Sequence, residues 1–599
     1  MKLKLLTLIF CLFMFSSCLK HDIMYEDPIN TQIRMNCDDV FGVTFPDNND
    51  WVSTINTSIN VHCANTDENI VKVQILMSEE KDSTINMTIL NEASTINNKD
   101  INIAYDVPKV LGKLFISYIN DKGVCFFDEF NTNDTDIYFE KNSSKTRALT
   151  QDYVLPKNDL VIWSTEESFA NQRGWLPGEV LYSPFAIEYM NANDYSESFK
   201  TIFRNVLFSY FKNGRKYNNL PLIKKSGYYN ESFYPITTAG DPIIVSPVYK
   251  NDGGYHEISE ADLYYYYFKG NKDLSVEELE ALPKYKAIDL STVYSNSDNN
   301  FIQKQKAYAL VYWGDGIPAP RFTMGTFDFP KGYKIGFMYR SKTETDQKKK
   351  QGEVYGDGRL NYNINNYGNF KSSKLEATSP RMAWFNINDR IFLCVESGTD
   401  ADFNDLILEV EGGIEDIIIP PLYEYQSYMF CFEDDRLGDY DMNDVVIKGE
   451  RLNETQVRYT LMASGAKDDL YIHNVEGEHI NHNIEVHNIL NRPQGSFINT
   501  VEGDDCDYVS DVITVSKEFS FLDVTTQPYI YNATKDWNVK ISRRGEDPHA
   551  IMIPYDFKWP LEKICIKDAY LKFNSWGRNQ LIEDNDWYKT PVIENVFNK

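Results

Sequence analysis

The sequence predicts a mainly β, multidomain protein with some α-structure: an Ig-like β-sandwich, then an α+β segment, then tandem β-sandwich modules of a jelly-roll-like kind. Short runs in which apolar and polar residues alternate recur along most of the chain, and clusters of Asn, Asp and Gly separate them. That rhythm is typical of antiparallel strands joined by tight turns. A length of 599 residues suggests about four domains, and 42% hydrophobic residues are enough to give each a core.

The N-terminus has the three zones of a secretory signal: Met1–Lys4 is basic, Leu5–Phe15 is apolar, and two serines precede Cys18. The eleven-residue apolar run is too short to span a bilayer. The Phe-Ser-Ser-Cys ending resembles the lipobox of bacterial lipoproteins, in which the cysteine receives the lipids. We therefore expect residues 1–17 to be a signal peptide and Cys18 to anchor the protein to the outer membrane, facing the periplasm or the cell surface. The alternative is an ordinary cleaved signal in which the cysteine is incidental.

The chain is strongly acidic, with 88 acidic against 60 basic residues and a formal charge of −28. Such a charge repels nucleic acid phosphates and attracts divalent cations, so we expect no nucleic acid partner. No nucleophile elbow, zinc motif or phosphate-binding loop occurs in the sequence. We therefore expect no catalytic residues and no enzymatic activity.

The cysteines are scattered along the chain without a recognisable spacing. Nine cysteines, less Cys11 and Cys18 in the leader, leave seven that form no C-x-x-C pair. Neither a disulfide framework nor a zinc ribbon is indicated, and we expect the seven to be mostly buried small hydrophobic side chains.

The first half of the chain divides by composition and periodicity. Residues 18–50 are polar and aperiodic and are expected to form a tether, residues 51–130 an Ig-like β-sandwich, and residues 131–151 a linker rich in Asn, Thr and Ser. Residues 152–306 are predicted to be a mixed α+β segment, with a helix over Tyr195–Phe211.

Two local signals lie inside that α+β segment. Ser275 and Glu278 form a capping box for a short helix. The aromatic run Leu263–Phe268 predicts a fully packed strand with aromatic side chains on both faces. The alternative is an exposed platform on which sugars stack.

The second half is again β-rich. Residues 307–419 are predicted to form a first β-module with an acidic loop, and residues 420–599 a second module, joined around the Pro420-Pro421 linker. After Pro560, the spacing of Ile566, Tyr570 and Phe573 predicts one terminal helix with an aromatic face, although Phe573 and its neighbours can equally be core residues.

An internal repeat marks the two β-modules. Phe392–Glu396 recurs as Met429–Glu433, and each copy is followed by a loop of the form D-x-D-x-N-D, at Asp400–Asp405 and Asp439–Asp444. The cysteines of the two copies lie 37 positions apart and the loops 39, so the copies differ by a two-residue insertion. Two copies of one supersecondary unit are expected.

The acidic loops are candidate calcium sites. Densely packed carboxylates repel one another unless a cation, protons or water screens them, and D-x-D-x-[DN] is the ligand-bearing half of a calcium loop. The candidate ligands are Glu396, Asp400, Asp402, Asn404 and Asp405 in the first copy and Glu433, Asp439, Asp441, Asn443 and Asp444 in the second. Glu450 falls at the EF-hand position twelve, but Val445–Lys448 is predicted to be a strand that carries it away from the loop. The alternative is a solvated turn in which Asp and Asn cap their own backbone.

Several segments carry a family resemblance. These are Phe432–Asp434, Gly438–Val446, Gly495–Thr500, Ile553–Glu562 and Trp587–Tyr588. They resemble the LruC-domain lipoproteins, and Asp402–Leu406 is similar to a second uncharacterised β-module usually found just upstream. The family is envelope-associated and its C-terminal module is a domain of unknown function, so the resemblance implies a location and a fold but no activity. Because Val395-Glu396-Ser397 stands where the family more usually has Phe-Glu-Asp, we expect weaker metal binding at the first loop.

Two functions from different classes are compatible with the sequence. The preferred one is non-catalytic surface binding or scaffolding, with a glycan or protein ligand at the cell surface and with calcium stiffening the acidic loops. The other is a glycan-binding or glycan-processing surface protein, which the 40 Tyr, 35 Phe and 9 Trp suggest. An exposed aromatic platform flanked by polar groups would favour the second.

Overall fold

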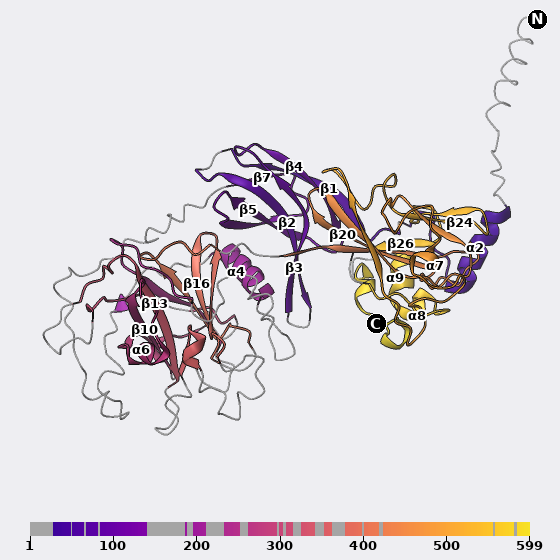
Figure 1. Ribbon diagram of the computed structural model, residues 1–599. Coiled ribbons are helices and arrows are strands. Elements are labelled where there is room, and N and C mark those ends of the chain that lie inside the picture. Colours follow the sequence, from indigo (N-terminus) through magenta and orange to yellow (C-terminus); the bar gives the residue numbers. More distant parts are fainter. Residues whose placement is uncertain are drawn as a thin grey trace, which may run out of the picture. The chain divides into compact units, whose positions relative to one another are not determined.

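The computed structural model describes residues 28–49, 51–64, 67–81, 84–139, 186–187, 196–210, 233–251, 261–295, 299–302, 307–315, 325–341, 353–361, 378–397, 401–418, 423–554, 557–579 and 584–599. In these ranges the chain is mainly β, with several separate and largely antiparallel sheets, so the predicted fold class is confirmed (Figure 1). The predicted signal peptide, Cys18 and the Pro420-Pro421 linker lie outside the described residues. None of the helices in these ranges is long and apolar enough to cross a membrane.

The chain divides into two units. The terminal unit combines Met1–Asn56, Asp106–Val110 and Ser427–Lys599, and the central unit combines Thr57–Tyr105 and Leu111–Gln426. A short piece of the region expected to be the Ig-like sandwich, 106–110, therefore belongs to the terminal unit. Asp106 shows why, because its buried carboxylate accepts hydrogen bonds from Ser520 Oγ and from the Phe521 backbone N–H at 2.8 Å.

Two sheets form the first part of the central unit, although residues 54–56 of β1 and 106–108 of β4 belong to the terminal unit. Their strands are β1 (Thr54–His62), β2 (Ile70–Lys81), β3 (Thr84–Ser94), β4 (Ile101–Pro108), β5 (Lys113–Asn120), β6 (Cys125–Asn131), β7 (Asp136–Tyr138) and β18 (Glu424–Tyr425). The strand orders are β18-β3-β2-β5-β6 and β4-β1-β7. Since β7 pairs in parallel with β1, with Asn60 opposite Asp136, the expected linker is wrong in its first residues.

Two further sheets complete the central unit. Their strands are β8 (Ala186–Ile187), β9 (Ile244–Lys250), β10 (Ala261–Lys269), β11 (Tyr285–Asp289), β12 (Ala307–Ala309), β13 (Tyr333–Ser341), β14 (Glu353–Tyr355), β15 (Met382–Ile387), β16 (Arg390–Val395) and β17 (Leu406–Glu411). The orders are β15-β16-β17-β9-β12-β8 and β11-β10-β13-β14. β9 pairs with β17, with Val245 opposite Val410, so the segments expected to part at residue 306 share one sheet. Local periodicity does not reveal a pairing between strands this far apart in sequence.

The local predictions in the central unit are confirmed. Helix α4 (Glu197–Tyr210) occupies the predicted range and buries Ile202, Phe203 and Val206. Helix α6 (Val276–Ala281) has the predicted capping box, in which the Ser275 hydroxyl accepts from the backbone N–H of Glu278 at 3.2 Å. Short 3-10 helices η3 (Leu290–Thr292) and η5 (Gly358–Asn361) follow β11 and β14.

The tyrosine run lies in strand β10 and faces the protein interior on both sides. Tyr264, Tyr265 and Tyr266 are each at most 1% exposed, and the Tyr265 hydroxyl donates to the Val311 carbonyl at 2.7 Å. The packed-strand interpretation is therefore confirmed, and this run forms no platform for sugars.

The terminal unit contains a five-stranded and a three-stranded sheet, of orders β23-β21-β20-β19-β26 and β22-β24-β25 (Figure 1). Their strands are β19 (Ser427–Phe432), β20 (Val445–Asn453), β21 (Gln456–Ala463), β22 (Leu470–His473), β23 (Val509–Thr514), β24 (Tyr529–Asn532), β25 (Trp537–Val539) and β26 (Ala550–Ile553). The helical elements are α2 (Pro28–Phe41), α7 (Val486–Ile489), α8 (Ile566–Ala569), α9 (Phe573–Asn579), η8 (Trp587–Lys589) and η9 (Ile593–Asn595).

The expectation of one terminal helix after Pro560 is wrong. Helices α8 and α9 are separated because Tyr570 is extended, with φ −136° and ψ 94°. Its hydroxyl donates to the Lys558 carbonyl at 2.7 Å, so a tertiary contact takes precedence over helical continuity. The aromatic side chains themselves are buried, as the core interpretation requires.

The expectation of a polar tether over residues 18–50 is wrong for its described part. Helix α2 buries Ile33, Cys37 and Phe41, a narrow stripe of every fourth residue that the intervening polar residues conceal. Phe41 and Trp51 both stack on Phe573, with ring centroids 5.6 and 5.9 Å apart. The seven cysteines after Cys18 are all free and buried, as predicted.

Candidate cation site

The sequence repeat is also a structural repeat. Strand β16, the first acidic loop and β17 form one hairpin, and β19, the second acidic loop and β20 form another. The registers correspond, since Val395 lies opposite Leu406 and Phe432 lies opposite Val445. The two loops therefore leave equivalent positions of equivalent strands.

Each loop has two residues in the left-handed backbone region. Ala401 and Phe403 have φ of 59° and 51° in the first copy, and Tyr440 and Met442 have 56° and 57° in the second. All four side chains are buried, and this packing offsets a backbone cost of about 1–2 kcal/mol per non-glycine residue. The alternation lets polar residues between them project together while consecutive N–H groups form a small concave nest.

A glutamate from the preceding strand occupies each nest. Glu396 accepts from the N–H groups of Asp402 and Phe403 at 2.9 and 3.2 Å. Glu433 accepts from the Met442 N–H at 2.7 Å. These glutamates were candidate ligands, and they also hold the loops in shape.

The last aspartate of each loop closes it onto the strand before it. Asp405 accepts from the Ser397 N–H at 2.6 Å and from its hydroxyl at 2.8 Å. Asp444 accepts from the Asp434 N–H at 2.6 Å. Ser397 and Asp434 thus hold equivalent positions, and the second copy has a carboxylate there where the first has a hydroxyl.

The second loop gathers three carboxylates. One oxygen from each of Glu433, Asp441 and Asp444 lies within 4.8 Å of the others, and no other group of three or more His, Cys, Asp or Glu side chains in the described ranges meets this spacing. Within the described ranges, no lysine, arginine or histidine forms an ion pair with any of these three carboxylates.

Burial and mutual repulsion raise the pKa of every member of this cluster. Burial, with Asp441 and Asp439 nearby, raises the pKa of Glu433 well above its usual value. Burial and Asp439 raise the pKa of Asp441 to about 8, and burial with Glu433 raises that of Asp444. Burial and mutual repulsion thus disfavour the charged forms of these carboxylates, and a bound cation would offset both effects.

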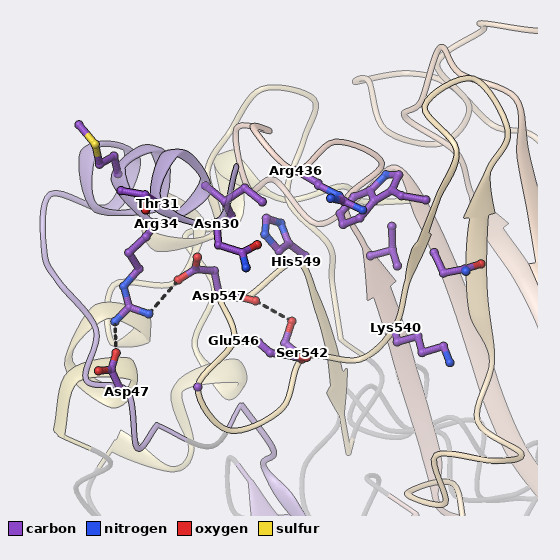
Figure 2. Close-up of a pocket in the computed structure, with 16 residues that line it drawn as sticks. Asn30, Thr31, Arg34, Asp47, Arg436, Lys540, Ser542, Glu546, Asp547 and His549 are labelled. Carbon is purple, nitrogen blue, oxygen red and sulfur yellow. Dashed lines mark hydrogen bonds and ion pairs between the residues drawn. The ribbon is translucent and has the colours of Figure 1, made fainter. Parts of the chain in front are cut away.

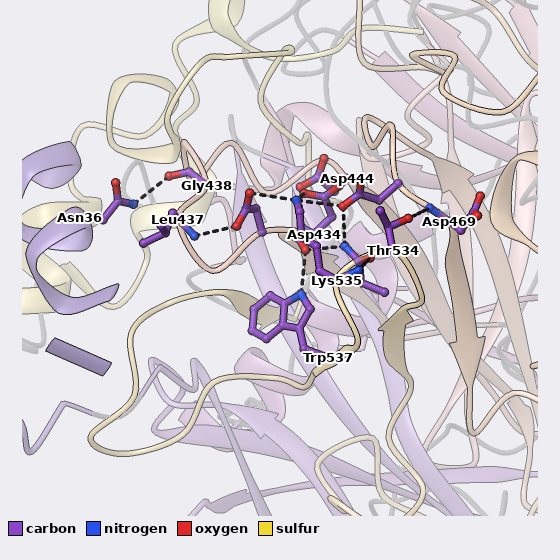
Figure 3. A network of polar contacts seen from close by, with 12 residues as sticks. Asn36, Asp434, Leu437, Gly438, Asp444, Asp469, Thr534, Lys535 and Trp537 are labelled. Atoms are coloured by element: carbon purple, nitrogen blue, oxygen red, sulfur yellow. Dashed lines mark hydrogen bonds and ion pairs between the residues drawn. The ribbon is translucent and has the colours of Figure 1, made fainter. Parts of the chain in front are cut away.

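A lysine neutralises the outer acids of this region (Figure 3). Lys535 Nζ lies 2.9 Å from Asp435, 2.8 Å from Asp468 and 3.8 Å from Asp434. The Asp434 carbonyl accepts from Trp537 Nε1 at 2.9 Å, which fixes the start of the loop. Lys535 thus pairs with carboxylates outside the group of three.

The first loop is less charged. It carries Ser397 where the second copy carries Asp434, and its described acids are Glu396, Asp402 and Asp405, since Asp400 lies outside the described residues. Asn404 Oδ1 accepts from Asn251 Nδ2 at 3.1 Å, so a neutral amide faces the position equivalent to Asn443. The structure therefore assembles a carboxylate cluster from the second copy, together with the exposed Asp439 at its edge.

Residues far away in sequence surround the second acidic loop, and no local sequence pattern predicts them. Asp468 and Lys535 follow different strands, and Lys535 lies 100 positions from its partner Asp435. Glu450 lies in β20, where Arg458 donates to it at 2.7 Å, so it is no loop ligand, as expected.

A separate cavity of about 1020 Å³ lies in the terminal unit between α2 and the segment around β25 (Figure 2). Its charged groups are of both signs, three basic and three acidic, and Arg34 contacts Asp47 at 2.9 Å and Asp547 at 3.3 Å. The Arg436 guanidinium lies over the Trp537 ring, 4.6 Å from its centroid. The cavity therefore presents no net charge that would select a ligand class.

Comparison with known proteins gives one match. Residues 541–588 match the family described as Domain of unknown function (DUF4842). No curated protein and no solved structure matches the chain. The DUF4842 segment contains β26, α8 and α9, and Ile566 within it donates its N–H to the Tyr440 carbonyl of the second acidic loop.

Proposed function

We propose that this chain is a non-catalytic, lipid-anchored protein of the outer membrane, acting in surface binding or scaffolding, whose second acidic loop is stiffened by Ca²⁺. The proposal that this loop binds a cation rests on the group of carboxylates formed by Glu433, Asp441 and Asp444. Three oxygens within 4.8 Å of one another leave room for one ion at the 2.3–2.6 Å that calcium prefers. The ligand atoms are all oxygen, which favours calcium over zinc or copper.

The location is proposed from the leader and the family resemblance. The DUF4842 match overlaps Ile553–Glu562 and Trp587–Tyr588, two of the segments that resemble LruC-domain lipoproteins. That overlap supports a C-terminal module of the same kind. Cys18 is the proposed acylated residue and the membrane attachment.

The glycan-binding alternative has less support. The aromatic run of β10 is buried, and Tyr138 and Tyr294 are the strongly exposed large aromatic side chains in the described ranges. Tyr138 stacks on His62 with centroids 4.5 Å apart. No ring contact joins Tyr138 to Tyr294 among the described side chains.

Calcium binding at the second acidic loop is tested by thermal unfolding of the chain from residue 19 onward. Calcium should raise the melting temperature of the terminal unit, because a ligand at 100 times its Kd adds about 2.7 kcal/mol to the free energy of unfolding. Asp441→Asn should abolish most of the increase, and Asp469→Asn, whose carboxylate accepts from Gln494 outside the loop, should retain it. An increase of equal size in both variants, or none in the wild type, contradicts the proposal.

The anchor is tested by fractionation of cells that express the full chain. Wild-type protein should sediment with outer membranes and carry acyl groups in intact-mass spectra. Cys18→Ser should remove both properties. If the serine variant still sediments with membranes and the wild type carries no acyl group, the anchoring proposal is wrong.

A further inference from the structure

The second acidic loop is hydrogen-bonded to the DUF4842 segment. Asn443 Nδ2 donates to the Pro560 carbonyl at 3.1 Å. The Lys563 N–H donates to Asp441 Oδ2 at 2.8 Å, and the Ile566 N–H donates to the Tyr440 carbonyl at 2.9 Å. The loop and this segment therefore meet through three hydrogen bonds within a short stretch.

Asn443 directs an oxygen toward a carboxylate of the same segment. Its amide orientation is fixed, because only the NH₂ group can donate to the Pro560 carbonyl, and the side chain is fully buried. Asn443 Oδ1 and Glu562 Oε2 are both buried and have no hydrogen-bond partner. A Cβ on Gly465 would lie 2.0 Å from the first oxygen and 3.0 Å from the second, so both face the same small space.

Two facing buried acceptors are unfavourable without a positive group between them. A buried acceptor left unsatisfied costs about 1–3 kcal/mol, and more when it is charged. Asp441 links this space to the carboxylate group, because its Oδ1 accepts from the Asn443 N–H at 3.3 Å and its Oδ2 accepts from the N–H of Lys563, the residue after Glu562, at 2.8 Å. The electrostatic environment of Glu562 is therefore part of the same acidic region.

The first loop lacks these features. There the equivalent oxygen, Asn404 Oδ1, accepts from the amide of Asn251 at 3.1 Å. Of the two equivalent asparagine oxygens, it is thus the one in the copy packed on the DUF4842 segment that has no hydrogen-bond partner among the described residues.

We propose that Glu562 and Asn443 are ligands of the divalent cation at the second loop, so that the ion joins the loop to the DUF4842 segment. This rests on the proposed calcium site: it retains Asn443, which the sequence already marked as a candidate ligand, and adds Glu562. Carboxylate and amide oxygens from Asp441, Asn443 and Glu562 suit a hard cation such as Ca²⁺, which accepts six to eight oxygen ligands. A consequence is that calcium should order the segment from Pro560 to Ile566 as well as the loop.

The experiment is a calorimetric titration with CaCl₂, combined with hydrogen exchange, on the chain from residue 19 onward. Glu562→Gln is the informative variant, because its amide can donate to Asn443 Oδ1 and preserve packing while the charge is lost. We expect calcium affinity to fall at least tenfold and calcium-dependent protection of residues 560–566 to disappear. Glu594→Gln, at an exposed glutamate of η9, is the matched control and should bind like the wild type.

The outcomes separate this inference from the proposed function. If Glu562→Gln binds calcium as tightly as the wild type and is equally protected, Glu562 is no ligand, while the calcium site at the loop stands. If wild-type protein binds no calcium, both are wrong. If Glu562→Gln is unfolded by circular dichroism, Glu562→Asp, which keeps the charge but shortens the side chain, is titrated instead, and an affinity equal to that of the wild type contradicts a ligand role.

Discussion

Asp444 accepts a hydrogen bond from the Asp434 backbone N–H at 2.6 Å, and this contact closes the second acidic loop without any ion. The equivalent contact between Asp405 and Ser397, also 2.6 Å, closes the first. The loops are therefore shaped by their own side chains, and a cation would act on a preformed cluster. Preformed geometry makes the contributions of shape and charge separable by substitution.

Asp444→Asn separates the contribution of loop shape from that of charge at one residue. Asparagine keeps an oxygen that can accept from the Asp434 N–H but removes one of the three repelling charges. We expect its melting temperature in EDTA to equal or exceed that of the wild type, and its stabilisation by calcium to be largely lost. Asp444→Ala should be destabilised by about 1–3 kcal/mol in EDTA as well, because the Asp434 N–H loses its partner. Calorimetry with and without calcium distinguishes these, and identical behaviour of the two variants would contradict the account.

Gly465→Ala tests the space between Asn443 and Glu562. The added methyl group would lie 2.0 Å from Asn443 Oδ1, so the asparagine must move. We expect a loss of about 1–3 kcal/mol in the free energy of unfolding and a weaker calcium affinity. Gly112→Ala is the control, since nothing lies within 4 Å of its Cβ position. Unchanged calcium binding in Gly465→Ala would show that these oxygens do not face the ion.

His549 should make the terminal unit acid-sensitive. Burial and the Arg436 guanidinium lower the pKa of His549 to about 4, against an ordinary value of 6.5. As pH falls below about 6.5, the unfolded chain takes up this proton before the folded chain does. The contribution to stability is therefore lost between pH 6.5 and 4, by up to about 3 kcal/mol.

Urea unfolding at pH 7 and pH 4.5 checks this effect. The stability deficit of His549→Gln relative to the wild type should be smaller at pH 4.5 than at pH 7. His479→Gln is the control of opposite sign, because a hydrogen bond to Asp511 raises the pKa of His479 and stabilises its charged form. A deficit for His549→Gln that grows toward low pH would refute the assignment.

Phe41→Ala tests the docking of helix α2. Phe41 is 2% exposed and stacks on Phe573, so its removal should cost about 3–5 kcal/mol in the terminal unit. Met35→Ala, on the same helix but 62% exposed, should change stability by less than about 0.5 kcal/mol. Equal melting temperatures for the two variants would return residues 28–41 to the role of a tether.

Features with local causes could be predicted from the sequence. Helix α4 follows from its apolar periodicity, the α6 cap from Ser275 and Glu278, and the burial of Tyr264–Tyr267 from the density of aromatic residues. The repeated acidic loops were visible because the same short pattern occurs twice. Their shared register and backbone conformation follow from that identity.

Features with distant causes could not be predicted. Helix α2 shows only a narrow apolar stripe, and its partners lie about 400 to more than 500 positions later, as Gly438, which accepts from Asn36, and Asn574, which donates to the Phe41 carbonyl, illustrate. Lys535 and Glu562 reach the acidic loop through strand pairing and through the fold of the terminal segment. The break between α8 and α9 depends on a tertiary contact of Tyr570, which overrides the helical spacing.

Calcium binding by the wild-type chain is the central claim, and a calorimetric titration of the protein from residue 19 onward, stripped of metal with EDTA and dialysed, tests it most directly. The account predicts saturable binding with a Kd below about 1 mM, the weak end for extracellular sites, at the second loop. Asp441→Asn should abolish that binding event, and Asp402→Asn should leave it in place. Heats that show no saturation up to about 1 mM calcium in the wild-type protein would contradict the account and leave both loops as hydrogen-bonded turns.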